Sequence, residues 1–284
     1  MHSPSLLSEG VLFLPRMICF PNAKINLGLQ ILKKRDDGFH EIKTCMYPIA
    51  VNDALEFHSS NSFSFKQSGK VLDNAPEDNI IVKTYELLKT KVDKLPKLDI
   101  HLLKNIPFGA GLGGGSADAA FFMATLIELL ELGITTEQQE EWISEIGSDC
   151  AFFIKNIPAI ASGRGEILTP IQLKLSEYSI QLICPTIHVS TATAYSGVLP
   201  TEQQPSLENI LLSDIATWKQ TLVNDFEKSV FTKEPVLANI KNELYAGGAL
   251  YASMSGSGSS VFGIFPKNKK ADIKIDIDFE EFIC

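Results

Sequence analysis

A glycine-rich stretch directly before a strongly apolar one is the feature that most restricts how this chain can fold. Residues 104–120 read KNIPFGAGLGGGSADAA, with five glycines, and FFMATLIELLEL follows without a break. Glycines cluster where a backbone takes positive φ angles or comes very close to another group. A glycine turn that opens a helix presents N–H groups without intrahelical partners at the positive end of the helix dipole, which suits a phosphate. The stretch therefore predicts an anion-binding loop, with a plain strand-to-helix connection as the alternative.

Length and composition describe an ordinary globular protein of about two domains. The chain has 284 residues, of which 45% are hydrophobic and 21% are charged. Its formal net charge of −9 argues against general binding to nucleic acids or anionic membranes, because such surfaces need a basic excess. An anionic ligand must therefore be met by a local pocket.

Cysteine usage and the N-terminal segment favour a cytoplasmic protein. The five cysteines lie far apart and form no CxxC pair, so neither a disulfide framework nor a zinc site is expected. No apolar run is long enough to span a membrane, and the N-terminus lacks the basic start of a secretory signal. Because a second methionine, Met17, precedes ICFPNAKINLGLQIL, we expect residues 1–16 to be a flexible extension or a misplaced translation start.

Hydrophobic periodicity predicts an α/β chain whose two domains share a cleft. Ile25, Leu27, Leu29 and Ile31 alternate along the chain, which predicts a half-buried strand, and an Asp-Gly turn follows it. The helix after the glycine loop is apolar on nearly every face and should be buried on several sides. Further strands are expected at 97–103, 177–185, 249–266 and 271–279, and helices at 117–132, 135–146, 209–222 and 235–248. The stretch 147–154 predicts a tight turn that leads into a buried strand.

Several familiar phosphate loops do not fit the glycine stretch. A Walker A loop needs a lysine after its last glycine, and none follows here. Gly109, Gly111 and Gly114 satisfy G-x-G-x-x-G, yet the acidic residue that a dinucleotide site needs about twenty residues on would fall within the helix. The stretch also lacks the valine of a protein-kinase loop, and the chain has no HRD motif and no G-x-S-x-G elbow.

The pattern Pro107-x3-Gly111-Leu-Gly-Gly-Gly-Ser116 instead resembles the phosphate loop of the GHMP kinases, a superfamily named after galacto-, homoserine, mevalonate and phosphomevalonate kinases. Two further stretches fit the order of motifs in that superfamily. PNAKINLGLQILKKRDDGFHEI, at 21–42, supplies a lysine on a first strand, and SMSGSGSSVFGIF, at 253–265, supplies a Gly-Ser-Gly turn. Taken alone, the first stretch would indicate only a solvated lysine, and the second only an ordinary hairpin loop.

Within that superfamily the chain resembles the 4-diphosphocytidyl-2-C-methyl-D-erythritol kinases. The stretches that carry this resemblance run from about Cys19 to Phe265 and read AKINLGL, KRDDGFHEI, EDNIIVK, GSDCAFF, GRGEILTP and NDFE. The resemblance implies a two-domain GHMP kinase fold, with a ribosomal-S5-domain-2-like nucleotide domain at 17–160 and a ferredoxin-like α/β domain at 161–284. It implies an active site in the cleft between the domains. The implied reaction is ATP-dependent phosphorylation of the substrate's 2-hydroxyl, a step of the non-mevalonate isoprenoid route.

The resemblance also implies roles for individual residues. Asp149 matches the aspartate that takes the proton from the substrate hydroxyl, and Lys24 matches the lysine that pairs with it. Asn26 should lie beside Lys24 and orient the methylerythritol hydroxyls, while the cytosine ring should be held by Phe39, His40 and Tyr195. The residues implied to hold ATP are Asn79, Lys104, Pro107, Phe108, Gly109, Ala110, Gly111, Leu112, Gly113, Gly114, Gly115, Ser116 and Ala117.

Magnesium is expected as the cation of the transferred phosphates, with Ser116 as the first choice of protein ligand. Asp118 stands where the family usually has asparagine, and its charge would repel a phosphate unless it points away or helps to hold the metal. Phe39 replaces the usual tyrosine, and Cys150-Ala151 the usual Val-Pro. Expected partners are ATP and a cytidyl diphosphate sugar alcohol, without nucleic acid or membrane, and a homodimer is left open. Another GHMP kinase substrate, or a non-catalytic binding module on the same fold, is the alternative.

Overall fold

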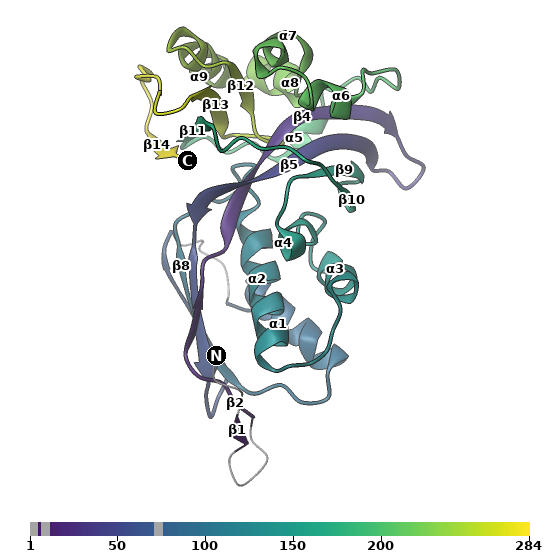
Figure 1. Ribbon diagram of the computed structural model, residues 1–284, viewed down its shortest axis with the longest axis vertical. Helices are drawn as coiled ribbons and strands as arrows, with labels where there is room; N and C mark the ends of the chain where they lie inside the picture. Colours follow the sequence, from purple (N-terminus) through teal and green to yellow (C-terminus); the bar gives the residue numbers. More distant parts are fainter. Residues whose placement is uncertain (1–4, 7–11, 71–75) are drawn as a thin grey trace. The chain divides into compact units, whose positions relative to one another are not determined.

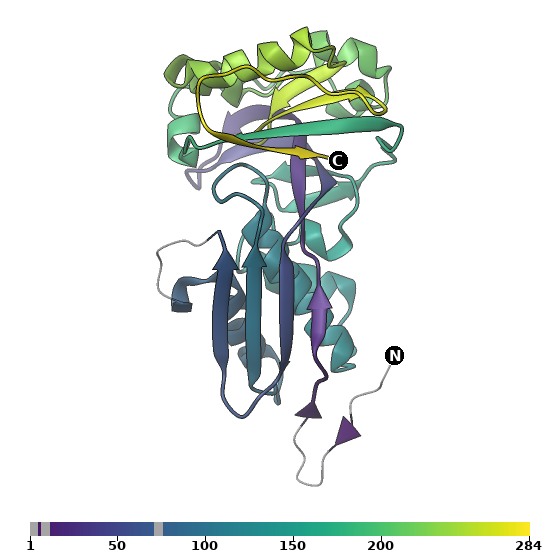
Figure 2. The same ribbon diagram turned by 90° about the vertical axis from the view of Figure 1, so that its left-hand side faces the viewer.

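The computed structural model describes residues 5–6, 12–70 and 76–284, which belong to two compact units (Figures 1 and 2). Unit 1 comprises the chain up to Ala23, Val51–Pro107 and Gly113–Asn156, and unit 2 comprises Lys24–Ala50, Phe108–Leu112 and Ile157–Cys284. The predicted extension at residues 1–16 lies largely outside the described residues. The predicted domain boundary after residue 160 stays a prediction.

Unit 1 is a four-stranded sheet with helices on one face (Figure 1). The strand order is β3-β6-β8-β7, in which only the β7–β8 pair is parallel. Alternate residues of β8 are buried, as its predicted period of two requires, and Phe57 of β6 meets Phe122 edge to face at 5.3 Å. The elements are β1 (Ser5–Leu6), β2 (Leu12–Phe13), β3 (Met17–Cys19), β6 (Ala54–Ser59), β7 (Ser64–Gly69), β8 (Leu98–Lys104), η1 (Pro76–Asp78), α1 (Ile80–Lys91), α2 (Gly114–Leu129), α3 (Thr136–Ser144) and α4 (Phe152–Lys155).

Helix starts in unit 1 follow capping chemistry. The helix after the glycine loop is confirmed, and it begins at Gly114 because Gly113, at φ 70°, takes the left-handed conformation at its N-cap. The predicted polar helix is also confirmed, and Thr135 and Gln138 form a capping box at its start. The turn predicted within 147–154 is present, but the buried strand predicted after it is wrong, because the chain there forms the short helix α4. An apolar run of four residues has no period that separates a strand from a buried helix.

Unit 2 contains two four-stranded sheets, ordered β10-β9-β5-β4 and β12-β13-β11-β14. Strand β11 pairs antiparallel with β13 on one edge and with β14 on the other. The strands are β4 (Asn22–Lys34), β5 (His40–Asn52), β9 (Ala159–Gly163), β10 (Ile167–Pro170), β11 (Tyr178–Pro185), β12 (Tyr251–Met254), β13 (Val261–Pro266) and β14 (Phe279–Ile283). The helices are α5 (Thr191–Tyr195), α6 (Leu207–Leu211), η2 (Ile215–Thr217), α7 (Trp218–Thr221), α8 (Phe226–Lys233) and α9 (Pro235–Ala246).

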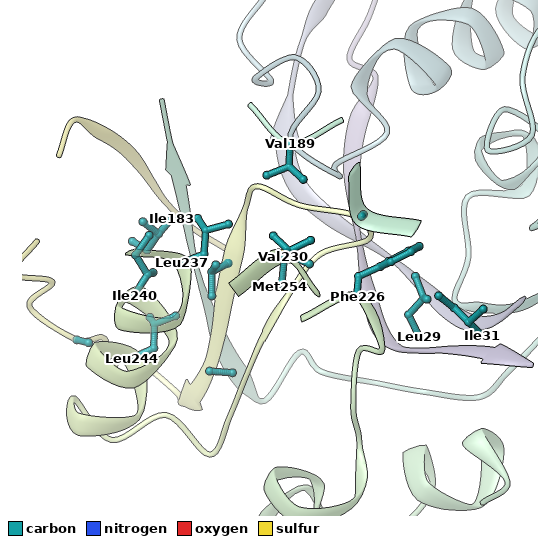
Figure 3. Packing of buried hydrophobic residues seen from close by; sticks show 14 of the residues in the cluster. Leu29, Ile31, Ile183, Val189, Phe226, Val230, Leu237, Ile240, Leu244 and Met254 are labelled. Atoms are coloured by element: carbon teal, nitrogen blue, oxygen red, sulfur yellow. The ribbon is translucent and has the colours of Figure 1, made fainter. Parts of the chain in front are cut away.

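The core of unit 2 joins helices α8 and α9 to strands from both sheets (Figure 3). Leu237 and Ile240 of α9 lie against Ile183 of β11, and Leu29 and Phe226 lie near one another where β4 meets the start of α8. Burial of these aliphatic and aromatic side chains is the main favourable term for folding. This core therefore fixes β4, which carries the predicted lysine, to the segment that holds the Gly/Ser turn.

Three predictions for unit 2 need correction. Strand β4 is not half-buried, because every residue from Ala23 to Ile31 is buried and its polar side chains bind other parts of the unit. The strand predicted at 271–279 forms only at its last residue, because β14 begins at Phe279 and the residues before it form no strand. The helix predicted at 209–222 is broken into α6, η2 and α7, and Asp214 caps the second piece by accepting a hydrogen bond from Ala216 N. Within the described part of the chain, no helix combines the length and the apolar character that crossing a membrane requires.

Candidate active site

Three stretches that the sequence singled out meet within unit 2: the lysine strand, the first half of the glycine loop and the Gly/Ser turn. The Lys24 ammonium donates a hydrogen bond to the Gly111 carbonyl oxygen at 3.0 Å, and Ser255 Oγ donates to the same oxygen at 2.8 Å. Lys24 N also donates to Leu112 O at 2.9 Å. One carbonyl group of the glycine loop thus joins the strand to the turn.

Glycine is required at position 111 by the closeness of this packing. The residue has a φ angle of +76°, and a Cβ atom added to it would lie 2.0 Å from the Ser255 carbonyl oxygen. That contact is with backbone, so no side-chain rotation can relieve it. The run of glycines is thus explained at this position by a close approach between two loops.

Lys24 and Asn26 lie side by side on β4, as the sequence predicted. Lys24 is 3% exposed, and its Nζ donates to Asn26 Oδ1 at 2.7 Å. Asn26 Nδ2 in turn donates to Thr44 Oγ1 at 3.1 Å, and Asn26 N donates to Ser255 Oγ at 3.2 Å. This network holds the lysine ammonium in a fixed position, which is what a group that acts on a bound substrate needs.

The NDFE stretch holds the Gly/Ser turn, a role that the sequence did not reveal. Asn224 is buried and its Nδ2 donates to Met254 O at 2.8 Å and to Gly256 O at 2.9 Å. Glu227 Oε1 accepts from Met254 N at 2.9 Å. In the sequence, the polar Asn-Asp pair between apolar segments was the only indication of this role. It could not identify the groups that Asn224 and Glu227 bind, because these lie some thirty residues further along the chain.

The second half of the glycine loop, in unit 1, forms a partly exposed helix N-terminus. Gly113 precedes the first turn of α2, whose leading N–H groups have no partner within a helix. A Cβ atom added to Gly115 would meet only Ile80 Cγ2, at 3.8 Å. Gly113, Gly115 and Ser116 are partly exposed. These amides, at the positive end of a 16-residue helix, can bind phosphate oxygens.

Asp149 and Ser116 both lie near the thiol of Cys150 in unit 1. Asp149 is partly exposed in the turn between α3 and α4, and the thiol of Cys150 shares a hydrogen bond with Ser116. Burial raises the pKa of that thiol to about 12, and the negative charge of Asp149 adds to the effect. The predicted base and the predicted magnesium ligand therefore both act on the same thiol. No cluster of three or more His, Cys, Asp or Glu side chains that could hold a metal occurs among the described residues. The Ser116 hydroxyl fits a magnesium ion that is bound chiefly by phosphate oxygens, because Mg²⁺ needs few protein ligands there.

An aromatic group in unit 2 follows the Asp-Gly turn. His40, the first residue of β5, stacks on Tyr195 with ring centroids 4.6 Å apart and an interplanar angle of 17°. Phe39 is 55% exposed, and the Arg164 guanidinium lies over its ring at 5.1 Å from the centroid. Asp37 Oδ1 accepts a hydrogen bond from Phe39 N at 3.0 Å, and this bond lowers the pKa of Asp37. The structure thus brings His40 and Tyr195 together and presents the face of Phe39.

Comparison with known proteins identifies the family. The chain matches the GHMP kinases N terminal domain over residues 79–163 and the GHMP kinases C terminal model over residues 206–276. It is 51% identical over 251 residues to the 4-diphosphocytidyl-2-C-methyl-D-erythritol kinase of Parabacteroides distasonis, a match that covers 88% of this chain and 92% of the relative. With the same kinase of Bacteroides fragilis it shares 48% identity over 272 residues, or 94% of this chain and 98% of the relative. The chain belongs to this kinase family.

Solved structures agree with this assignment. A crystal structure of 4-(cytidine 5'-diphospho)-2C-methyl-D-erythritol kinase matches with a TM-score of 0.75 at 30% identity, covering 87% of this chain and 90% of that one. The homoserine kinase of Cytophaga hutchinsonii matches with a TM-score of 0.64 at 15% identity, which shows a shared fold alone. The predicted α/β GHMP kinase fold is confirmed, and the protein is a small-molecule kinase.

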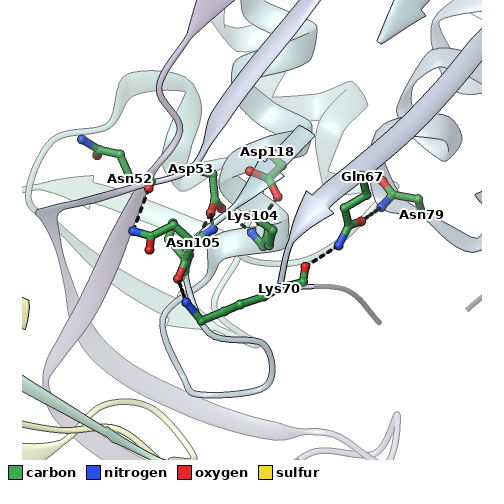
Figure 4. A network of polar contacts seen from close by, with 9 residues as sticks. Asn52, Asp53, Gln67, Lys70, Asn79, Lys104, Asn105 and Asp118 are labelled. Atoms are coloured by element: carbon green, nitrogen blue, oxygen red, sulfur yellow. Dashed lines mark hydrogen bonds and ion pairs between the residues drawn. The ribbon is translucent and has the colours of Figure 1, made fainter. Parts of the chain in front are cut away.

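Two residues predicted on the ATP side of this kinase have their side chains engaged in unit 1 (Figure 4). Lys104 is 2% exposed and forms ion pairs with Asp53 and Asp118. Asn79 caps α1 by accepting a hydrogen bond from Ile81 N at 2.9 Å, and its Nδ2 donates to Gln67 Oε1 at 3.2 Å. Their contact with ATP stays a prediction.

Proposed function

We propose that this kinase transfers the γ-phosphoryl group of ATP to the 2-hydroxyl of 4-diphosphocytidyl-2-C-methyl-D-erythritol, giving ADP and the 2-phosphate. This is a step in the non-mevalonate synthesis of isoprenoid precursors. The observation that carries the proposal is the buried junction in which Lys24 binds the Gly111 carbonyl of the glycine loop. This junction holds the strand that faces the acceptor substrate next to the loop that faces the ATP phosphates. Phosphoryl transfer requires the two bound substrates to be aligned in this way.

The glycine loop and the first turn of α2 bind the ATP phosphates through backbone amides. Ser116 would hold the magnesium ion through its hydroxyl, which lies next to Cys150. When bound, Mg²⁺ neutralises charge on the transferred phosphates. Because amides and a metal meet both anions, a kinase with a net charge of −9 does not need a basic surface.

Asp149 accepts the proton of the attacking hydroxyl. A carboxylate in a partly exposed turn is a weak base, so its contribution lies in position and in stabilising the departing proton. Lys24 supplies positive charge for the reaction, and its position is held by Asn26. Asn26 also orients the methylerythritol hydroxyls.

Phe39, His40 and Tyr195 bind the cytosine ring. The exposed face of Phe39 offers stacking area, and the His40 imidazole can hydrogen-bond to the base edge. Tyr195, on α5, stacks on the His40 ring and adds a second aromatic face to the site. We place the reaction in the cytoplasm, which the widely spaced cysteines favour, and we leave open whether the kinase forms a homodimer.

Initial rates with a panel of acceptors test the proposal. The purified protein is incubated with Mg²⁺-ATP and, separately, the cytidyl substrate, mevalonate and homoserine, and ADP release is followed. We expect turnover of the cytidyl substrate alone, and its loss in Asp149→Asn with ATP binding unchanged. Turnover of mevalonate or homoserine instead would replace the proposed substrate, and ATP binding without any turnover would favour a binding module.

A further inference from the structure

Thr44, on strand β5, is a buried polar residue to which the proposed reaction gives no role. It is 0% exposed and lies four residues after His40 on the same strand. Thr44 Oγ1 donates a hydrogen bond to Gly28 O at 2.5 Å and accepts one from Asn26 Nδ2 at 3.1 Å. Both partners lie on β4, the neighbour of β5 in the sheet. Thr44 therefore connects the strand that begins with His40 to the strand that carries Asn26.

The hydroxyl group of Thr44 decides which way the Asn26 amide faces. A threonine hydroxyl has a single proton, and here that proton is used in the bond to Gly28 O. Toward Asn26 the hydroxyl can only accept, so it binds the NH₂ end of the amide. The oxygen end, Oδ1, then faces Lys24 and accepts the hydrogen bond from its ammonium group at 2.7 Å. An amide turned the other way would place two donors, its NH₂ group and the ammonium group, against each other.

The bond between Thr44 and Gly28 forms at an irregular point of β4. Gly28 has a φ angle of +66°, which lies outside the range of a regular strand. Irregular strand positions of this kind often redirect side chains next to active sites. A Cβ atom added to Gly28 would lie 2.6 Å from Leu222 Cδ1, so the packing there also favours glycine. The direction in which the Thr44 hydroxyl donates is thus set by the backbone of β4.

Asn26 is held on its backbone side by a second hydroxyl group with the same arrangement. Ser255 Oγ donates to Gly111 O at 2.8 Å and accepts from Asn26 N at 3.2 Å. A Cβ atom added to Gly256 would lie 3.1 Å from Asn26 Oδ1, so the amide fits closely against the Gly/Ser turn. Among the described residues, Thr44 is the only hydrogen-bond partner of Asn26 Nδ2. The orientation of the amide therefore depends on Thr44 and Lys24.

We propose that Thr44 is a positioning residue for phosphoryl transfer: its hydroxyl sets the direction of the Asn26 amide and, through it, the place of the Lys24 ammonium group beside the glycine loop. Without this hydroxyl the amide can turn its NH₂ end toward Lys24. The ammonium group then loses one of the two acceptors that fix it, Asn26 Oδ1, and moves relative to Gly111 O. This inference rests on the proposed function in taking Lys24 as a group that acts in the transfer.

Steady-state kinetics of Thr44→Val test the inference, because valine keeps the shape of threonine and lacks its hydroxyl. With Mg²⁺-ATP and the cytidyl substrate, kcat should fall roughly 10- to 100-fold, as displacement of a positioned group causes. The KM for ATP should not change, and Thr44→Ser, which keeps the hydroxyl, should restore most of the lost rate. The matched control is Thr84→Val. Thr84 is also buried and its Oγ1 donates to Ile80 O at 2.8 Å, so this variant loses a similar bond and should keep the wild-type kcat.

A double variant separates positioning from general support of the fold. In Asn26→Ala no amide is left for Thr44 to orient, so adding Thr44→Val should lower kcat no further. Losses that multiply in the double variant would overturn the inference. So would a wild-type kcat in Thr44→Val, or equal losses in Thr44→Val and Thr44→Ser. Should Thr44→Val not fold, Thr44→Ala also lacks the hydroxyl and is smaller, and the same results are expected of it.

Proton exchange of the Asn26 side-chain amide, followed by NMR, tests the inference without any turnover. Exchange with solvent should be slow in the wild type and in Thr44→Ser, and faster in Thr44→Val, where the NH₂ group has lost its partner. Equal exchange rates in all three proteins would overturn the inference. A wild type that does not phosphorylate the cytidyl substrate would overturn the proposed function alone, and the exchange rates would then decide the role of Thr44.

Discussion

Gly111→Ala tests the junction between the glycine loop and the Gly/Ser turn. At φ +76° a side chain costs about 1–2 kcal/mol, because the left-handed region crowds Cβ against the backbone. The new Cβ would also lie 2.0 Å from Ser255 O, so the turn must move and the hydrogen bond from Lys24 to Gly111 O is strained or lost. A hydrogen bond to a charged group contributes about 1.5–3 kcal/mol. The free energy of unfolding should therefore fall by about 3–5 kcal/mol.

Urea unfolding measures this loss in unit 2. The chain has two tryptophans, so in a Trp142→Phe background the buried Trp218 of α7 reports unit 2 alone. The matched control is Gly248→Ala, since Gly248 has φ +95° and nothing within 4 Å of an added Cβ. It should lose only the conformational cost of about 1–2 kcal/mol. Equal losses in the two variants would show that the close approach of loop and turn does not exist.

Three further predictions address other parts of the kinase. Asn224→Ala should destabilise unit 2 by about 2–4 kcal/mol, because it removes two hydrogen bonds to buried carbonyl groups. Asn209→Ala, at an exposed position of α6, should cost much less in the same unfolding assay. Phe39→Ala should raise KM for the cytidyl substrate at least tenfold and leave KM for ATP unchanged; a rise in both would contradict a role in binding cytosine. The pKa of Asp118 is about 8 in the folded protein, against an ordinary value of 3.8. The free energy of unfolding should therefore be highest below pH 4 and fall between pH 4 and about pH 8, by at most about 1.4 kcal/mol per pH unit. Asp118→Asn should flatten this slope in unfolding titrations, and an unchanged slope would contradict the raised pKa.

Hydrophobic periodicity located most of the helices and strands, because the folded chain buries the faces that the pattern marks as apolar. Strand β8 alternates Leu98, Ile100 and Leu102 toward the core, and α2 is apolar on nearly all sides and buried. The alternation at 271–279 did not produce a strand before Phe279, because a strand also needs a partner, and the chain pairs with β11 only from Phe279 on. Local pattern therefore predicts an element only where the tertiary structure supplies its partner.

The order of motifs predicted which stretches of the chain come together, but it did not predict their contacts. The lysine strand, glycine loop and Gly/Ser turn do meet, but no spacing rule indicates that one carbonyl group, that of Gly111, would bind both Lys24 and Ser255. Asp118 was a departure from the family pattern without an explanation. Its partners, Asp53 and Lys104, lie 65 and 14 positions away in sequence, and only the folded chain brings them together.

In the proposed reaction, this kinase transfers phosphate to one hydroxyl of the cytidyl substrate. Phosphorus NMR of the product, after incubation with Mg²⁺-ATP, shows which hydroxyl carries it. We expect one new phosphomonoester signal, coupled to the methyl-bearing carbon of the erythritol and equal in amount to the ADP formed. ADP formation without that signal, or phosphate on another hydroxyl, would contradict it.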